Sequence, residues 1–363
     1  MPGKILIACD SFKGCLSSRE VADAVSRGLS SADAALVPLE LADGGEGTAT
    51  VLTRALSGVE VTAVVSDPLG RPIKASYGLC GDMAIIDTAA ASGLTLLCPN
   101  ELNPLLTSTY GTGELIADAL RRGSRRVMVG LGGSATNDGG MGMLRALGAH
   151  FYAADGAELP GRGCDLERVE RMDLSGLQSA EFTVLCDVTT PFTEAARVFG
   201  PQKGASLKVV EQLSAGLEHF ASSCLAQTGH LMDTLPGSGA AGGLGGAFDA
   251  FLGAKLQSGI EAVLEAIGFD ALLEGATLVI TGEGRADAQT AQGKVAAGVL
   301  RHAQACGVPV VLLAGQICPC PELSALGFAQ MIQITPPGMP LGEAMQKNVA
   351  GENIVRALQE IMC

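Results

Sequence analysis

The sequence predicts an α/β protein in which a doubly wound domain is interrupted by an inserted second α/β domain. Short apolar runs alternate with helical patterns in the first 60 residues and again between about residues 275 and 335. The 363-residue chain is longer than one usual hydrophobic core requires. Because compact domains keep their termini close, we expect residues 1–60 plus 265–363 to form one domain and residues 61–264 the insertion.

The first two predicted strands each lead through a loop into a helix. Residues 4–8 form an apolar strand, and Ser17 and Glu20 have the spacing of a capping box at the start of the next helix. Residues 35–39 form a second strand, which precedes a helical pattern at residues 51–56. Two consecutive β-loop-α units favour a parallel sheet.

The predicted insertion begins with a hairpin pattern. Extended runs at residues 59–65, 73–79 and 83–87 alternate with Pro-Leu-Gly and Cys-Gly-Asp turns. A helix over residues 113–122 then leads to an apolar strand at residues 127–129.

The α/β pattern returns towards the C-terminus. Strands are predicted at residues 277–280, 308–313 and 331–334, with a helix over residues 295–305. These strands resemble the N-terminal pair, so we assign them to the same sheet.

The amino-acid composition limits the classes of binding partner and indicates the cellular compartment. The formal net charge of −14 argues against nucleic-acid binding, which needs clustered Lys and Arg. No apolar run approaches the roughly 18 residues of a membrane span, so we expect no membrane partner. Eleven cysteines at irregular spacings, without a CxxC pair or a secretory segment, indicate reduced thiols in the cytoplasm.

A glycine-rich stretch, GLGGSATNDGG at residues 130–140, joins a predicted strand to a helical pattern at residues 141–147. Glycines let consecutive N–H groups turn toward one point, and a helix N-terminus adds partial positive charge, which suits phosphate. The polar side chains of the loop can bind a phosphoryl group or Mg²⁺, although an ordinary strand-to-helix turn is an alternative. The candidate binding residues are Gly132, Gly133, Ser134, Thr136, Asn137 and Asp138.

Charged side chains directly follow both N-terminal strands, where ligands collect in open α/β sheets. Asp10, Ser11 and Lys13 follow the first strand. Lys13 can pair with a carboxylate or phosphate, and Asp10 can orient it. Asp43 and Glu46 follow the second strand among glycines, and their hard oxygens suit Mg²⁺. Solvated loops or simple turns are the alternatives.

A predicted loop at residues 282–287 repeats this arrangement. Glu283 lies between two glycines, and Arg285 adds a planar guanidinium suited to a carboxylate or phosphoryl group. Lys294 is a second candidate cation near the same predicted loop, or else a surface residue. Neither Gly-Lys pair of the chain is followed by Ser or Thr, so a Walker A motif is absent.

Asp187 follows the apolar run at residues 182–186. A carboxylate at the end of a strand can take a proton from a hydroxyl nucleophile, whereas the alternative is a turn before Pro191. Gln202 and Lys203 lie in a short polar segment bounded by Pro and Gly, a form common in binding loops.

Residues 237–242 match the dinucleotide fingerprint G-x-G-x-x-G, but no clear strand precedes them. Helix packing against a close backbone, or a second phosphate-facing loop, explains them at least as well. No histidine lies in any of these loops, which gives little support to a Ser-His-Asp hydrolase. An NAD(P)-dependent oxidoreductase and a non-catalytic anion-binding module remain alternatives to phosphoryl transfer.

Six motifs, taken together, resemble the bacterial glycerate kinase family that has no P-loop, the glycerate 2-kinases of glucarate and glyoxylate catabolism. The resemblance spans nearly the whole chain. The motifs are DSFKG at 10–14, ADGGEG at 42–47, YGTGE at 110–114, GGSATNDGG at 132–140, FGPQKG at 199–204 and GEGR at 282–285. Thr190 departs from the Asn common in the family, and Ala286 from a bulkier residue, which affects local contacts but not the reaction class.

The resemblance implies phosphorylation of D-glycerate to 2-phosphoglycerate, with ATP and Mg²⁺ as cofactors. It also implies a flavodoxin-like domain and an inserted domain that resembles a restriction-enzyme fold. We expect in-line transfer of the γ-phosphoryl group in a cleft between the domains, dominated by positioning and charge neutralisation. The alternative product is 3-phosphoglycerate, and a homodimer is compatible with the sequence.

Roles follow for the candidate residues in this hypothesis. Asp187 is the general base, and Lys13 and Arg285 hold the substrate carboxylate or the transferred phosphoryl group. Glu46 or Glu283, with Asp43 as a further candidate, positions Mg²⁺. The remaining candidates for substrate and ATP binding are the glycine loop with Asp10, Ser11, Gln202, Lys203 and Lys294.

Overall fold

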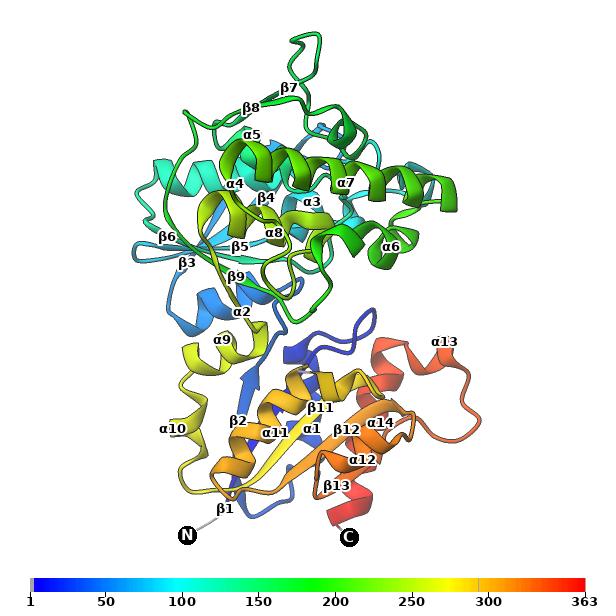
Figure 1. Cartoon of the computed structure of the whole chain (residues 1–363). Coiled ribbons are helices and arrows are strands. Elements are labelled where there is room, and N and C mark those ends of the chain that lie inside the picture. The colour runs from blue at the N-terminus through cyan, green and yellow to red at the C-terminus, as the bar shows by residue number, and fades with distance from the viewer. Residues whose placement is uncertain (1–2, 293, 363) are drawn as a thin grey trace. The chain divides into compact units, whose positions relative to one another are not determined.

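A computed structural model describes residues 3–292 and 294–362 of the chain (Figure 1). The α/β fold class is confirmed, since both parts of the chain combine a sheet with helices. The chain divides into two compact units: unit 1 is Met1–Asp43 with Ile260–Cys363, and unit 2 is Gly44–Gly259. No helix in the described part of the chain is both long and apolar enough to cross a membrane.

Unit 1 contains a five-stranded parallel sheet in the order β13-β12-β11-β1-β2. Its strands are β1 (Gly3–Cys9), β2 (Ala34–Glu40), β11 (Ala276–Ala286), β12 (Val310–Ile317) and β13 (Gln330–Gln333). The N-terminal strand lies in the middle, where Ile7 is opposite Pro38 on one side and Ile280 on the other. The core of unit 1 therefore joins segments from both ends of the chain.

Helices cover both faces of this sheet, as expected for a doubly wound domain. They are α1 (Ser18–Gly28), α9 (Gly259–Ala266), which crosses the unit boundary, α10 (Phe269–Leu273), α11 (Val295–Ala305), α12 (Pro321–Ala325), α13 (Leu341–Ala344) and α14 (Lys347–Met362). Helices α1 and α14 share a core with Leu313, whereas Ala296 of α11 packs with the alternate residue Leu312. The capping box is confirmed: Ser17 is the N-cap of α1, and its amide donates a 2.8 Å hydrogen bond to the carboxylate of Glu20.

Unit 2 contains a six-stranded sheet in the order β10-β9-β6-β5-β4-β3. Its strands are β3 (Val59–Ser66), β4 (Pro72–Cys80), β5 (Met83–Asp87), β6 (Arg126–Gly130), β9 (Glu181–Leu185) and β10 (Lys255–Gln257). Strands β5, β6, β9 and β10 are parallel, and β3–β5 are joined by the antiparallel hairpins that the sequence predicts. β7 (His150–Tyr152) and β8 (Arg171–Asp173) form a separate antiparallel pair.

Most helices of unit 2 pack around a core dominated by Ala, Leu, Val and Phe side chains. The helices of this unit are α2 (Thr48–Ala55), α3 (Ala89–Ser92), α4 (Tyr110–Arg121), α5 (Met141–Ala146), α6 (Ala195–Phe199), α7 (Leu207–Thr228) and α8 (Ala240–Leu252). The 3₁₀ turns are Leu94–Leu96, Pro99–Glu101, Gly163–Arg168, Phe192–Glu194 and Pro201–Lys203, with Thr290–Gln292 in unit 1.

The structure differs from the sequence-based boundaries in three places. The unit boundary follows Asp43 instead of residue 60, because α2 packs on β4 and β5 of unit 2. The return to unit 1 comes at Ile260, earlier than the expected residue 265. The segment predicted as a loop at residues 282–287 is largely strand: β11 continues to Ala286 because Glu283 and Arg285 pair with β12.

Candidate active site

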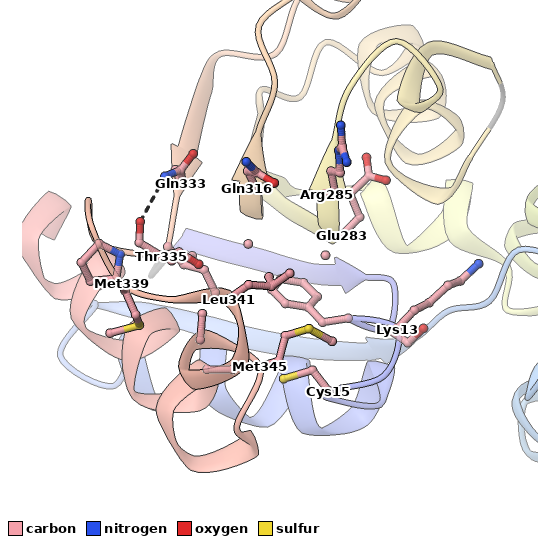
Figure 2. A pocket seen from close by; sticks show the side chains of 18 of the residues that line it. Lys13, Cys15, Glu283, Arg285, Gln316, Gln333, Thr335, Met339, Leu341 and Met345 are labelled. Atoms are coloured by element: carbon pink, nitrogen blue, oxygen red, sulfur yellow. Dashed lines mark hydrogen bonds between the residues drawn. The ribbon is translucent and has the colours of Figure 1, made fainter.

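In unit 1, the carboxyl ends of β1 and β11 lie side by side and bring together candidates from both ends of the chain. Cys9 at the end of β1 is in register with Gly282, which places Asp10 next to the Glu283 end of β11. The strand order changes direction between these two strands, and open α/β sheets bind ligands at such a point. A cavity of about 610 Å³ opens here, and all its lining residues belong to unit 1 (Figure 2).

Asp10 is nearly buried at this edge, with 7% of its surface exposed. Its Oδ1 accepts a 2.7 Å hydrogen bond from the amide of Ser11. Burial, followed by the negative charge of Asp43, raises the pKa of Asp10 to about 7, and the positive charge of Lys13 opposes the rise. Asp10 can therefore exchange a proton near neutral pH.

The ammonium group of Lys13 lies 2.8 Å from Oδ2 of Asp43, and its side chain is 72% exposed. Partial burial acts to lower the pKa of Lys13, but the charge and hydrogen bond of Asp43 outweigh it and the pKa is raised. Lys13 is therefore positively charged, and its side chain lines the cavity.

Three further candidates line the same cavity: Glu283, Arg285 and Lys294. Glu283 is buried; its Oε1 has no hydrogen-bond partner among the described residues, and its Oε2 lies 3.8 Å from the Lys294 ammonium group. Burial raises the pKa of Glu283, and its hydrogen bond with Thr290 and the charge of Lys294 oppose that shift. Arg285 is 63% exposed and pairs with Asp287 at 3.1 Å.

In unit 2, parallel strands also end side by side. Asp87 at the end of β5 is in register with Gly130 of β6, which is in register with Leu185 of β9. The glycine loop and Asp187 follow the last two of these strands, so they share one edge of the sheet with Asp87.

Sequence reasoning missed Asp87. Its carboxylate accepts hydrogen bonds from the amides of Gly47 at 2.8 Å and Ala49 at 3.0 Å, at the start of α2. A carboxylate after an apolar strand was the signal that singled out Asp187, and the same signal was present at residues 83–87.

The glycine loop buries most of its polar side chains. Ser134 is 5% exposed, and the side chains of Thr136, Asn137 and Asp138 are fully buried. Asp138 accepts hydrogen bonds from the amide and hydroxyl of Thr109 and from the amides at residues 140 and 142. Burial raises its pKa, and these bonds act against the rise. Asp138 therefore stabilises the loop through buried hydrogen bonds. Gly132 and Gly133 are the solvent-accessible residues of the loop.

Lys203 is buried behind this loop, with 2% of its surface exposed. Its ammonium group donates to Oγ of Ser134 at 3.0 Å and to the carbonyl of Thr136 at 2.6 Å. Burial lowers the pKa of Lys203 to about 7, and the charge of Asp138 opposes the shift. Lys203 thus touches the loop, whereas Gln202 beside it is exposed.

Asp187 is held firmly beyond the end of β9. Its Oδ1 accepts hydrogen bonds from the hydroxyl of Ser258 at 2.8 Å and from the amide of Gly259 at 3.0 Å. Two fixed donors define the orientation of the carboxylate, which a general base requires.

The candidate metal ligands are divided between the two units. Asp43 and Glu283 belong to unit 1, whereas Glu46 is exposed in unit 2 and lines a different cavity of about 480 Å³ beside Asp87. Among residues 3–292 and 294–362, no three His, Cys, Asp or Glu side chains are grouped to hold a metal ion.

The second glycine-rich segment, at residues 237–246, packs against the first. It follows helix α7, with no strand between them in the described chain, and it opens helix α8. The amide of Gly139 donates to the carbonyl of Gly242 at 3.0 Å, and a Cβ atom at Gly242 would lie only 2.2 Å from the carbonyl oxygen of Thr136. Close backbone packing explains the glycines of this segment. A dinucleotide fingerprint requires a strand directly before it, and the described residues between α7 and α8 form none.

Comparisons with known proteins agree along the whole chain. Residues 5–363 match the model of the glycerate kinase family. The chain is 42% identical to a glycerate kinase of Bacillus subtilis (strain 168), covering 99% of this chain and 96% of that one. It is 45% identical to glycerate 2-kinase of Escherichia coli (strain K12), over 86% and 85% of the two chains. A solved structure described as glycerate kinase 2 from Salmonella typhimurium LT2 superimposes with a TM-score of 0.84 at 42% identity, covering 99% of this chain and 97% of that one.

These matches confirm the resemblance carried by the six motifs. The protein belongs to the glycerate kinase family.

Proposed function

We propose that the protein is a glycerate 2-kinase, which transfers the γ-phosphoryl group of ATP to D-glycerate and forms 2-phosphoglycerate and ADP. The observation that carries the proposal is the match of residues 5–363 to the glycerate kinase family. The 2-position follows the name of the Escherichia coli relative, glycerate 2-kinase. Each sheet edge carries side chains of the kind that phosphoryl transfer requires.

Asp187 is the general base in this proposal. Its carboxylate takes the proton of the attacking glycerate hydroxyl, and the donors from Ser258 and Gly259 keep it in one orientation. Gly133 is the exposed residue of the loop, and its backbone amide can donate to an anionic group bound beside Gly132. Lys203 holds Ser134 in place behind it. Gln202 is an exposed candidate for contact with substrate.

Lys13, Arg285 and Lys294 bind the phosphates or the glycerate carboxylate. All three line the unit 1 cavity, and Lys13 and Arg285 expose most of their side chains there. Phosphoryl transfer depends on such cations because negative charge spreads over the phosphoryl oxygens in the transition state. Asp10 and Ser11 form the wall of the cavity beside Lys13.

Glu283 fits Mg²⁺ best among the candidate carboxylates. Its Oε1 is buried without a hydrogen-bond partner among the described residues, whereas Asp43 is paired with Lys13 and Glu46 is exposed in unit 2. Proteins usually hold Mg²⁺ by one or two carboxylates together with substrate phosphates, so a cluster of three protein ligands is not required. The bound ion would neutralise charge on the phosphates.

Finer features of the fold belong to the same proposal. When the strands of unit 1 are numbered along the chain, their order is 2-1-3-4-5, which supports a flavodoxin-like domain. For unit 2 we propose the restriction-enzyme-like fold that the family resemblance implies. We also propose a cytoplasmic location and leave the monomer and homodimer as outcomes of a sizing experiment.

The test is ³¹P NMR of the purified protein with D-glycerate, ATP and Mg²⁺, alongside samples without glycerate and with EDTA. We expect the signal of 2-phosphoglycerate only in the complete mixture. A signal of 3-phosphoglycerate would support glycerate kinase activity but contradict phosphorylation at the 2-position. Unchanged ATP would reject glycerate kinase activity, and NAD(P) titration would then test the oxidoreductase.

A further inference from the structure

The unit 1 cavity has two chemically different ends (Figure 2). One end carries the charged groups described above. The other end is apolar and comes from the β13–α13 connection, α13 and the loop after β1. Its side chains are Phe12, Ile334, Met339, Leu341, Ala344 and Met345. A ligand that fills the cavity must therefore combine a charged part with an apolar part.

The size of the cavity argues against glycerate as its main occupant. About 610 Å³ is the volume of a site for a cofactor or a drug-sized ligand. Glycerate is a small polar acid, so it would fill a fraction of this space and would gain nothing from the apolar end.

The apolar end has the character of a surface that binds a flat ring. Leu341 is 71% exposed and Met345 is 40% exposed, so large apolar side chains border the cavity without being covered. Methionine is flexible and polarisable and makes favourable contacts with aromatic rings. Together with Met339, these side chains can cover a planar heteroaromatic base.

One wall of the cavity links the two ends through neighbouring strands. Gln316 of β12 is in register with Arg285 of β11, and Gln333 lies on the adjacent strand β13. Gln333 is anchored: its Oε1 accepts a 3.0 Å hydrogen bond from the amide of Ile317, and its Nε2 donates to the carbonyl of Thr335 at 3.1 Å. The side-chain amide of Gln316 offers a donor and an acceptor next to this fixed group.

We infer that the unit 1 cavity binds the adenosine part of ATP. The base lies against Met339, Leu341 and Met345, and the polyphosphate extends past Gln316 toward Arg285 and Lys13. The inference rests on the proposed use of ATP and assigns the nucleoside to unit 1, not to the glycine loop of unit 2. The charged end of the cavity, which would hold the phosphates, lies at the change in strand order between β1 and β11, where open α/β sheets bind ligands.

Photolabelling with 8-azido-ATP locates the base without requiring turnover. We expect labelled peptides from residues 331–345 or 12–15, and excess ATP should suppress the labelling while glycerate should not. Labelling confined to residues 132–140 would overturn the inference.

A substitution provides a second, kinetic test. Ala344→Phe places a ring in the apolar end, and we expect the KM for ATP to rise about tenfold or more while the KM for glycerate stays within about twofold. Ala325→Phe is the matched control, because Ala325 is an exposed helical alanine of unit 1 that does not line the cavity.

The two proposals fail in different ways. An unchanged KM for ATP in an active Ala344→Phe enzyme would overturn the cavity assignment and leave the kinase proposal intact. If the wild type binds and photolabels in the cavity but does not phosphorylate glycerate, the kinase proposal fails and the nucleotide site stands.

Discussion

Two lysines at the two sheet edges show how differently the units use the same side chain. Lys13 in unit 1 is 72% exposed and is paired with Asp43 beside an open cavity. Lys203 in unit 2 is 2% exposed and donates to Ser134 and the backbone of Thr136. The first can meet a ligand directly, whereas the second can act on a ligand only through the loop that it supports.

The comparison extends from the lysines to the edges around them. Unit 1 presents its charged groups to a cavity, where they can contact a ligand directly. Unit 2 places its polar side chains inside the glycine loop and leaves backbone and a fixed carboxylate at the edge. Substitution of the exposed Lys13 should therefore change catalysis alone, whereas substitution of the buried Lys203 should change both stability and catalysis.

The largest effect should come from Asp187→Asn. The amide keeps the size and the Oδ1 acceptor that Ser258 and Gly259 use, but it cannot accept a proton. We expect kcat to fall roughly 10²-fold or more with little change in the KM for glycerate, in a coupled ADP assay. Glu181→Gln, an exposed position at the other end of β9, should be neutral. Near-normal turnover would remove Asp187 from the role of base.

Lys13→Met should lower kcat/KM by about 10–100-fold, because a charge-assisted contact to phosphate or carboxylate is lost. Its unfolding free energy should change by less than about 0.5 kcal/mol, since the Lys13 side chain is 72% exposed. Lys347→Met is the matched control: Lys347 is also exposed and lies 2.8 Å from a carboxylate, that of Glu20, but it does not line the cavity. A large stability loss with normal kinetics would contradict the contrast between the units.

Lys203→Met should produce the opposite pattern. The apolar stem remains, but Ser134 and the carbonyl of Thr136 lose a buried donor, so the unfolding free energy should fall by about 1–3 kcal/mol. Turnover should fall as the loop loses its support. Lys208→Met, at an exposed position on α7, controls for loss of charge alone. If denaturant unfolding of the Lys203 variant matches the wild type, the lysine does not support the loop.

Asp10 offers a smaller test, through pH. Its folded-state pKa of about 7 lies above the ordinary value, so the stability it contributes is present at low pH and is lost as the pH rises through 7. Between pH 6 and pH 8 the wild type should lose about 1 kcal/mol relative to Asp10→Asn. Urea unfolding of both proteins at the two pH values measures the difference. Parallel curves would place the pKa of Asp10 in its ordinary range.

The sequence allowed a good prediction of the elements, because local signals determine them. Ser17 and Glu20 mark the start of α1, and the hairpin turns mark β3 to β5. The end of β11 was missed because Glu283 and Arg285 become strand only through pairing with β12, and glycines on either side conceal that pairing in the sequence.

The burial and hydrogen bonding of individual side chains were harder to predict than the positions of the loops that carry them. The glycine loop was correctly placed between a strand and a helix, but its pattern does not tell which side chains turn inward. Asp138 and Lys203 are buried because segments distant in sequence, including Thr109, close over them. The early unit boundary has the same origin, since α2 belongs to unit 2 through contacts with later strands.

The position of β1 between β2 and β11 also sets an order of events during synthesis. Unit 2 is one continuous segment and can fold as it leaves the ribosome, whereas Ile7 must wait for Ile280 before its strand has both neighbours. Asp10 meets the Glu283 end of β11 only at that late stage. A chain that stops before residue 276 would contain the glycine loop and Asp187 but not the unit 1 cavity, so binding in that cavity reports that synthesis has passed Ala350.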